Sequence, residues 1–234
     1  MKKPFFLFSE DIGKMSIKQH LYYWVVPFVV LFTLMAFYFS QIPILMELVS
    51  PTRNWELGIL ENLQLLVILA IILLSAFAVA RVEGSLLKLG FGLLALFSIF
   101  ILLEEMDYGS HFGFENYFLK YFGTSNIHNI DANAKWYKRP IYLVITFLFF
   151  VAPYWNSSIQ NRFIKYLIPP PRLILAAFVI FCADVIPRLI VFLKLRPDGG
   201  LGVNIGEFSE LFIYYLFLLY VLQLIFTKRL STES

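Results

Sequence analysis

Charged residues are scarce in this sequence. Only 15% of the 234 residues are Asp, Glu, Lys or Arg, whereas 59% are hydrophobic and the mean hydropathy is +0.74. Values of this kind lie far outside the range of soluble domains and within that of integral membrane proteins. The composition therefore excludes a soluble globular protein. The net charge of +3 gives no indication of nucleic-acid binding.

Cysteine, histidine and the common catalytic motifs are also scarce or absent. The single Cys182 cannot form an intramolecular disulfide and is expected to be a packing residue. The sequence contains no HExxH, no paired ExxH, no GxSxG and no P-loop motif. It also has no convincing internal repeat, which weakens the case for an inverted-repeat transporter. Short motifs therefore identify no reaction.

Long apolar runs take up most of the chain. A helix needs about 20 residues to cross a hydrocarbon core of roughly 30 Å, and the runs lack the alternation of barrel strands. We therefore predict an all-α, polytopic integral membrane protein, a bundle of about six transmembrane helices over 21–226. A cytoplasmic segment, 1–20, precedes the bundle and a cytoplasmic tail, 227–234, follows it. The predicted spans are 21–42, 57–80, 86–103, 140–155, 173–194 and 208–226.

Lys and Arg are distributed unevenly between the predicted loops. They are more numerous in the two terminal segments and in the loops on the same side, which places both termini in the cytoplasm by the positive-inside rule. The long loop 104–139 is then extracytoplasmic. Tryptophans flank the predicted helix ends, as expected at a membrane interface: Trp24, Trp55, Trp136 and Trp155.

Two adjacent carboxylates end the third predicted helix, in the stretch LLEEMDYGSHFGFENYF. At a helix C-terminus Glu104 and Glu105 oppose the helix dipole and repel each other, so they need a cation, a metal or bound protons. We predict that both are catalytic. If the helix continues by one or two turns, one face also carries Asp107, Tyr108 and His111.

Carboxylates from other helices are expected in the same extracytoplasmic half. Glu61 lies early in the second helix, Glu207 and Glu210 open the sixth, and Asp184 lies midway along the fifth with Arg188 one turn further. A charge at mid-membrane costs about 2.5–3.5 kcal/mol, so these side chains should face a polar cavity. Simpler interpretations exist. Asp184 and Arg188 can neutralise each other, and Glu207 and Glu210 suit the positive end of a helix dipole.

The outer loop adds two histidines to this acidic set. His111 follows the third helix, and His128 lies beside Asn129 and Asp131 in SNIHNID. Glu, Asp and His together suit a divalent metal such as zinc, manganese or iron. We therefore predict Glu61, His111 and His128 as metal ligands.

Three short patterns resemble a family of bacterial multi-pass membrane proteins of unestablished activity. They are EEMDYG, the NIHN that follows about 20 residues later, and EN early in the second helix, all within 55–130. The family has Gln where this chain has Ser110. The resemblance implies a bacterial inner (plasma) membrane protein. The family positions it implies are Glu61, Glu104, Glu105, Tyr108, Gly109, His128 and Asn129. The chain is less similar to ceramidase-like membrane hydrolases, whose paired late histidines are missing because 173–226 contains no His.

Three functions are compatible with these patterns. The first is a metal-dependent hydrolase or transferase acting on a lipid-linked or membrane-embedded substrate at the outer leaflet. The second is a cation- or proton-coupled transporter, in which Asp184 and Arg188 form a gate. The third is a structural or accessory subunit that binds partner subunits. The inner half of the bundle shows few polar residues, which disfavours the transporter.

Overall fold

Every regular element in the described part of the chain is a helix. The computed structural model describes residues 15–51, 58–108, 115, 120–121, 143–155, 159–195 and 206–226. It confirms the predicted all-α class. The chain divides into two compact units, one of residues Met1–Glu61 and Ile145–Ser234, the other of Asn62–Val144. Each unit is described by itself.

The first unit begins with a long apolar helix that has a π-helical turn. Its parts are α2 (Ile17–His20), η1 (Leu21–Val25) and α3 (Val26–Phe39). A capping box starts it, because the Ser16 amide donates to Gln19 and the Gln19 amide donates to Ser16 Oγ. The helix ends at Phe39, before the predicted position 42, since Gln41 has a φ of 62°. Pro43 then opens α4 (Pro43–Val49).

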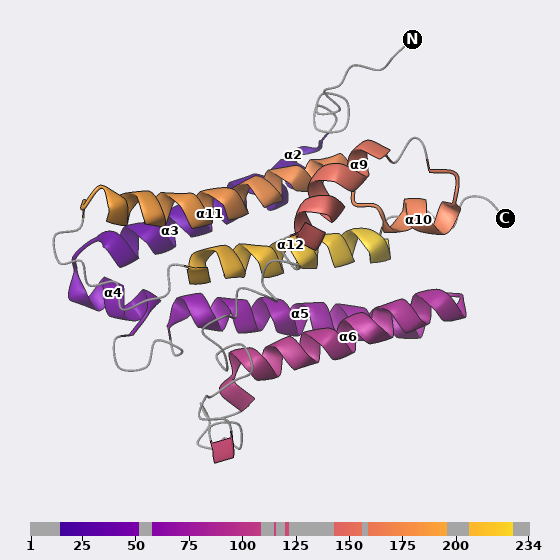
Figure 1. Ribbon diagram of the computed structural model, residues 1–234, viewed down its shortest axis with the longest axis horizontal. Helices are drawn as coiled ribbons and strands as arrows, with labels where there is room; N and C mark the ends of the chain where they lie inside the picture. The colour runs from indigo at the N-terminus through magenta and orange to yellow at the C-terminus, as the bar shows by residue number, and fades with distance from the viewer. Residues whose placement is uncertain are drawn as a thin grey trace, which may run out of the picture. The chain divides into compact units, whose positions relative to one another are not determined.

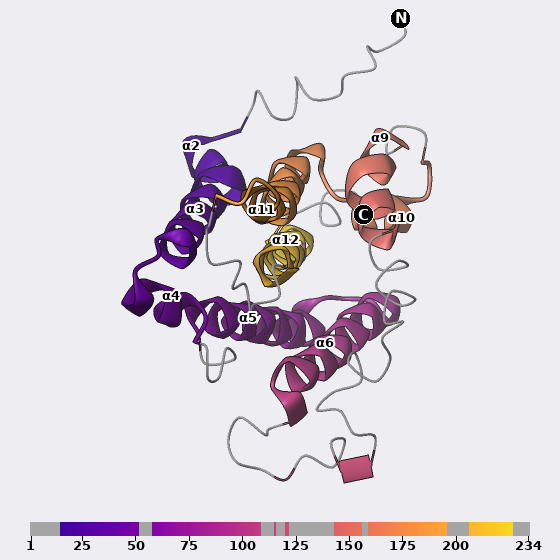
Figure 2. The ribbon, with the colours of Figure 1, turned by 60° about the vertical axis from the view of Figure 1, so that its left-hand side comes forward.

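Two antiparallel helices, α11 (Ile174–Phe192) and α12 (Gly206–Phe226), lie side by side in the first unit (Figures 1 and 2). Small buried side chains on α11, among them Ala176, Ala177 and Ala183, permit close approach. The core there also contains Tyr23, Phe149, Leu173, Leu216 and Leu219. Pro187 lies inside α11 and is buried.

Shorter helices complete this unit. The fourth predicted span is helical over Leu143–Trp155, which includes η5 (Phe147–Val151) and α9 (Ala152–Trp155) and has fewer than 18 residues. α10 (Arg162–Leu167) begins at Asn161, whose side chain accepts hydrogen bonds from two backbone amides. η7 (Pro171–Leu173) leads into α11.

The second unit contains an antiparallel helical hairpin. Its helices are α5 (Ile59–Arg81), whose first three residues belong to the first unit, and α6 (Ser85–Glu105). Gly84 turns the chain between them with a φ of 96°, a conformation that suits glycine. Besides Glu61, the buried residues of α5 recur every three or four positions: Leu60, Gln64, Ile68, Ile71, Ser75 and Ala78.

Five helices in the described residues are long and apolar enough to cross a membrane. They are Ile17–Phe39, Ile59–Arg81, Ser85–Glu105, Phe163–Phe192 and Gly206–Phe226. The protein is thus a helical membrane protein. The six-span topology and the orientation of its termini stay predictions.

Candidate acidic site

The first carboxylate of the site is Glu61, in the first turn of α5. Its position depends on Gly58, because a Cβ atom built there would lie 2.1 Å from the backbone oxygen of Val49. Only glycine permits the end of α4 to approach the start of α5 so closely. Leu60 is buried beside Glu61 and anchors the same turn. The close approach therefore determines where the Glu61 side chain begins.

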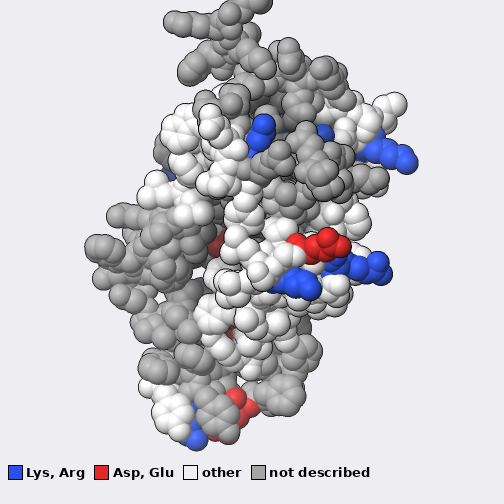
Figure 3. All heavy atoms as spheres, turned by 90° about the vertical axis from the view of Figure 1, so that its right-hand side faces the viewer, with Lys and Arg blue, Asp and Glu red and all other residues white. Residues whose placement is uncertain are grey.

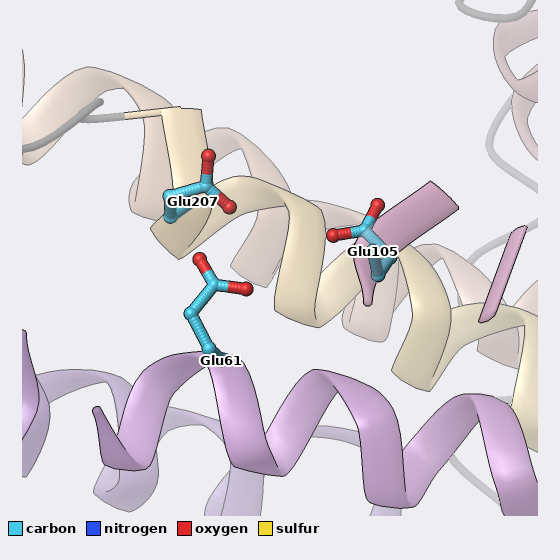
Figure 4. A group of neighbouring side chains, drawn as sticks. All are labelled: Glu61, Glu105 and Glu207. Atoms are coloured by element: carbon cyan, nitrogen blue, oxygen red, sulfur yellow. The ribbon is translucent and has the colours of Figure 1, made fainter. Parts of the chain in front are cut away.

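The second carboxylate is Glu207, in the first turn of α12. Ser209 Oγ donates a hydrogen bond of 2.8 Å to the Gly206 carbonyl in that turn. Figure 4 shows the Glu61 and Glu207 side chains pointing toward each other, and each offers a carboxylate oxygen within 4.8 Å of the other. Each residue is only 5% exposed. The two form a buried acidic pair within the first unit.

The electrostatics of this pair favour a bound cation. Both carboxylates lie at helix N-termini, where the dipole stabilises negative charge by roughly 0.3–1 kcal/mol each. Two like charges 4 Å apart repel by on the order of 4 kcal/mol at an effective dielectric constant of about 20. The repulsion exceeds the stabilisation by the helix dipoles, so a cation bound between the two carboxylates would relieve it.

The end of α6, in the second unit, carries a further buried acidic group. Glu104 and Asp107 are buried, and the Tyr108 hydroxyl donates a short hydrogen bond to the Glu104 carboxylate. Asp107 and Tyr108 have φ values of 45° and 53°. A left-handed conformation is unusual for a residue as bulky as tyrosine. The helix therefore stops at Glu105. It does not continue by the one or two further turns that would place these residues on one face. The Tyr108 side chain nevertheless reaches Glu104.

Tyr108 is held in its protonated form. Burial of the phenol, its hydrogen bond to Glu104 and the charge of that carboxylate raise the pKa of Tyr108 well above its ordinary value of 10.0. A protonated phenol is a donor, so Tyr108 orients the Glu104 carboxylate. Glu105, also drawn in Figure 4, is the last residue of α6 and is half-buried.

The predicted residues on α11 and α12 occupy different environments. Asp184 Oδ1 accepts hydrogen bonds from Arg188 Nε at 3.0 Å and from Nη2 at 2.8 Å. The Arg188 side chain is exposed and the Asp184 side chain is partly exposed. This contact is the structural pair that the sequence spacing indicates. Glu210 is half-buried, one turn after Glu207.

Four predicted site residues lie outside the described residues: His111, His128, Asn129 and Asp131. Sequence reasoning missed the role of Gly58, although a glycine directly before a predicted helix is a signal for a close backbone approach. It also assigned no site role to Gln64, which is fully buried one turn after Glu61.

Comparison with known proteins adds no name to this site. No family model matches the chain, and neither the curated proteins nor the solved structures include a match. The resemblance based on EEMDYG and NIHN stays a prediction.

Proposed function

We propose that Glu61 and Glu207 bind a divalent cation at one end of the helical bundle, and that the site hydrolyses or transfers a group on a membrane-embedded substrate. The observation that carries this proposal is the buried carboxylate pair, with oxygens within 4.8 Å of each other. Buried carboxylates at this distance are costly without positive charge. A cation site gives them a physical reason to be there.

The donor set fits a hard or borderline divalent ion. Metal–oxygen distances are about 2.0–2.6 Å, so two oxygens on one ion lie at most roughly 4–5 Å apart. The Glu61 and Glu207 oxygens satisfy this limit. Carboxylates suit magnesium, calcium, manganese, zinc or iron better than ions that require thiolates. A bound divalent ion would supply Lewis-acid activation of water and of a carbonyl or phosphoryl oxygen.

Glu105 is the last residue of α6 and directly follows the buried Glu104 in the second unit. In this proposal Glu105 is the general base that takes a proton from water, and Glu104, oriented by Tyr108, is its positioning residue. His111 and His128 are proposed further ligands.

The distribution of polar groups favours an enzyme over a transporter. On the buried face of α5, Glu61 and Gln64 occupy the first two turns, whereas Ile68 and Ile71 follow before the next polar residue, Ser75. A proton or ion relay needs polar groups along the whole path. A site that opens to one membrane face needs them only at one end. The third candidate, an accessory subunit with a merely structural acidic layer, differs because it requires no metal.

Metal analysis of the detergent-purified protein tests the proposal. Wild type, Glu61→Gln and Glu207→Gln are dialysed against manganese or zinc, then against metal-free buffer, and assayed by elemental analysis after size-exclusion chromatography. Glu83→Gln is the matched control, because Glu83 is an exposed glutamate at the hairpin turn, far along α5 from Glu61. We expect close to one metal ion per wild-type and control chain and a loss of most of it in both site variants.

The alternatives give different results. A well-folded wild type that retains no metal under any of these conditions contradicts the cation site and leaves the accessory function. A bound metal that survives in both site variants places the metal elsewhere. If the metal is confirmed, Glu105→Gln separates ligation from catalysis, since a general base is needed for turnover and not for retention of the metal.

A further inference from the structure

A second polar cluster lies at the other end of α11 and α12. Gln223 is 16 residues after Glu207 on α12, which at 1.5 Å per residue is about 24 Å along the helix. Arg172 precedes α11 in η7, and Tyr23 lies in η1. All three residues belong to the first unit. This cluster is therefore separate from the acidic pair.

Neutral groups hold the arginine of this cluster. Arg172 Nη2 donates a hydrogen bond of 3.0 Å to Gln223 Oε1, and its Cζ atom lies 5.8 Å from the centre of the Tyr23 ring. Gln223 Nε2 in turn donates to the Tyr23 hydroxyl, and Tyr23 is buried. The amide and the ring fix the plane of the guanidinium before any ligand binds.

The positive charge of Arg172 has no carboxylate partner among the described residues. The ion pairs there join Lys120 to Glu115 and Arg188 to Asp184. Arg172 Nε is buried and donates to none of the described atoms. Arg172 as a whole is half-buried, and a partly desolvated cation without an anion is costly. A cation at the N-terminal end of α11 also opposes the helix dipole. An anion bound there would satisfy both the guanidinium and the helix terminus.

The surroundings of Arg172 have the character of a membrane interface. The Tyr166 hydroxyl donates a hydrogen bond of 2.5 Å to the Leu224 carbonyl, which ties α10 to the end of α12. α10 exposes both an apolar residue, Ile164, and a cation, Lys165. Trp24 is exposed next to Tyr23. In Figure 3, which views the molecule from the right-hand side of Figure 1, Lys and Arg side chains (blue) lie among residues other than Lys, Arg, Asp and Glu (white). Tryptophan and cations are typical of the lipid headgroup level.

We propose that Arg172, fixed by Gln223 and Tyr23, binds the phosphate of an anionic phospholipid headgroup. A planar guanidinium matches phosphate oxygens in a bidentate arrangement. The position beside exposed apolar and basic side chains favours a lipid over a soluble phosphate ester, because a lipid can keep its acyl chains against the apolar surface. Lys165 contributes only long-range charge.

Native mass spectrometry of the full-length protein in detergent tests this site. The probes are phosphatidylglycerol, phosphatidylcholine as a zwitterionic lipid, and glycerol 3-phosphate as a soluble phosphate ester. The proteins are wild type, Arg172→Gln, Arg172→Lys and the control Lys165→Gln. We expect wild type to retain phosphatidylglycerol in preference to phosphatidylcholine. Arg172→Gln should weaken it about tenfold or more, as the loss of a charge-assisted hydrogen bond implies, and Lys165→Gln about twofold or less.

The second variant keeps the test decisive if Arg172→Gln does not fold. Arg172→Lys retains the charge and loses the planar fork, so it should fold and bind the lipid several-fold more weakly than wild type. Equal lipid binding by wild type and every folded Arg172 variant would overturn the site. A lack of preference for phosphatidylglycerol over phosphatidylcholine would also overturn it. Arg172-dependent competition by glycerol 3-phosphate at similar concentrations would overturn the lipid as the ligand and indicate a soluble phosphate.

Discussion

At the scale of single residues, the Glu61–Glu207 pair makes stability depend on cations. Without metal, Glu207→Gln removes the like-charge repulsion, so the metal-free variant should melt above metal-free wild type, by roughly 2–4 °C for each kcal/mol relieved. Added manganese or zinc should raise the melting temperature of wild type and leave the variant unchanged. Differential scanning fluorimetry with and without a chelator measures both effects. A variant that melts lower than wild type in chelator would show that Glu207 stabilises the fold through other contacts.

Tyr108 gives a prediction about pH. Because its pKa in the folded protein is raised above the ordinary 10.0, the stability from the phenol–Glu104 hydrogen bond is fully present below about pH 10. That stability is lost as the pH rises through the raised pKa. Tyr108→Phe should lower the free energy of unfolding at neutral pH by about 1 kcal/mol, since it leaves Glu104 without this donor.

Absorbance at 295 nm follows the ionisation directly. The difference between the titrations of wild type and Tyr108→Phe isolates Tyr108, and it should show almost no phenolate near pH 10, where a free tyrosine is half ionised. Half ionisation of Tyr108 at that pH in the folded protein would contradict the hydrogen bond to Glu104.

Residue identities predicted that carboxylates converge at one end of the bundle, but did not predict which of them form a close pair. Glu61 and Glu207 each stand out as carboxylates in an apolar chain, and both were expected at the same end of the bundle. Their mutual distance depends on how Glu61, in the first turn of α5, and Glu207, in the first turn of α12, are brought together within the first unit, which no local pattern encodes. Glu207 therefore had an equally good local explanation as a first-turn acid.

At the scale of elements, Gly58 controls the junction between α4 and α5. Gly58→Ala would place Cβ 2.1 Å from the Val49 backbone oxygen, so the start of α5 must shift. We expect a loss of about 1–3 kcal/mol and a weaker metal site. Gly90→Ala in α6 is the matched control, because a Cβ there meets no atom within 4 Å. It should be neutral or stabilising by roughly 0.5–1 kcal/mol. Thermal melts of both variants measure these effects. Equal losses of stability in the two variants would contradict the role of Gly58.

The ion pair on α11 should be structural. Arg188→Ala leaves the Asp184 charge on a predicted membrane span without the two hydrogen bonds it now accepts, so the yield and melting temperature should fall. The double variant Asp184→Ala/Arg188→Ala should recover most of the loss. A double-mutant cycle should show a coupling of about 1 kcal/mol or more. If the effects of the two single substitutions simply add in the double variant, the ion pair is not structural. That result would be compatible with a gate.

At the scale of the whole molecule, the number of membrane crossings determines where the termini lie. The five long helices together with Leu143–Trp155 would give six crossings and two cytoplasmic termini, whereas five crossings put the termini on opposite sides. We predict six, with Leu143–Trp155 as a short span. A C-terminal green fluorescent protein fusion should fluoresce, and an alkaline phosphatase fusion after Tyr108 should be active. Five crossings would be shown by two results together: a C-terminal green fluorescent protein fusion that does not fluoresce, and an alkaline phosphatase fusion at the C-terminus that is active.

The amino-acid sequence by itself determined the fold class and most of the helix positions. Apolar runs of about 20 residues have one stable form in lipid, because every backbone polar group must be satisfied within the segment. The helices α5, α6, α11 and α12 accordingly begin and end within a few residues of the predicted bounds. The i, i+4 spacing of Asp184 and Arg188 likewise predicts their contact, since a helix brings such positions together.

Only the tertiary structure decided which polar groups meet. The left-handed turn at Asp107 and Tyr108 stops α6 and still delivers the phenol to Glu104, an arrangement that helical periodicity does not predict. Glu61 and Glu207 come together, as do Arg172, Tyr23 and Gln223, although these residues are far apart in the chain. Local backbone preferences act over a few residues, whereas these contacts follow from which apolar faces fit one another. The chemistry we propose depends on those contacts.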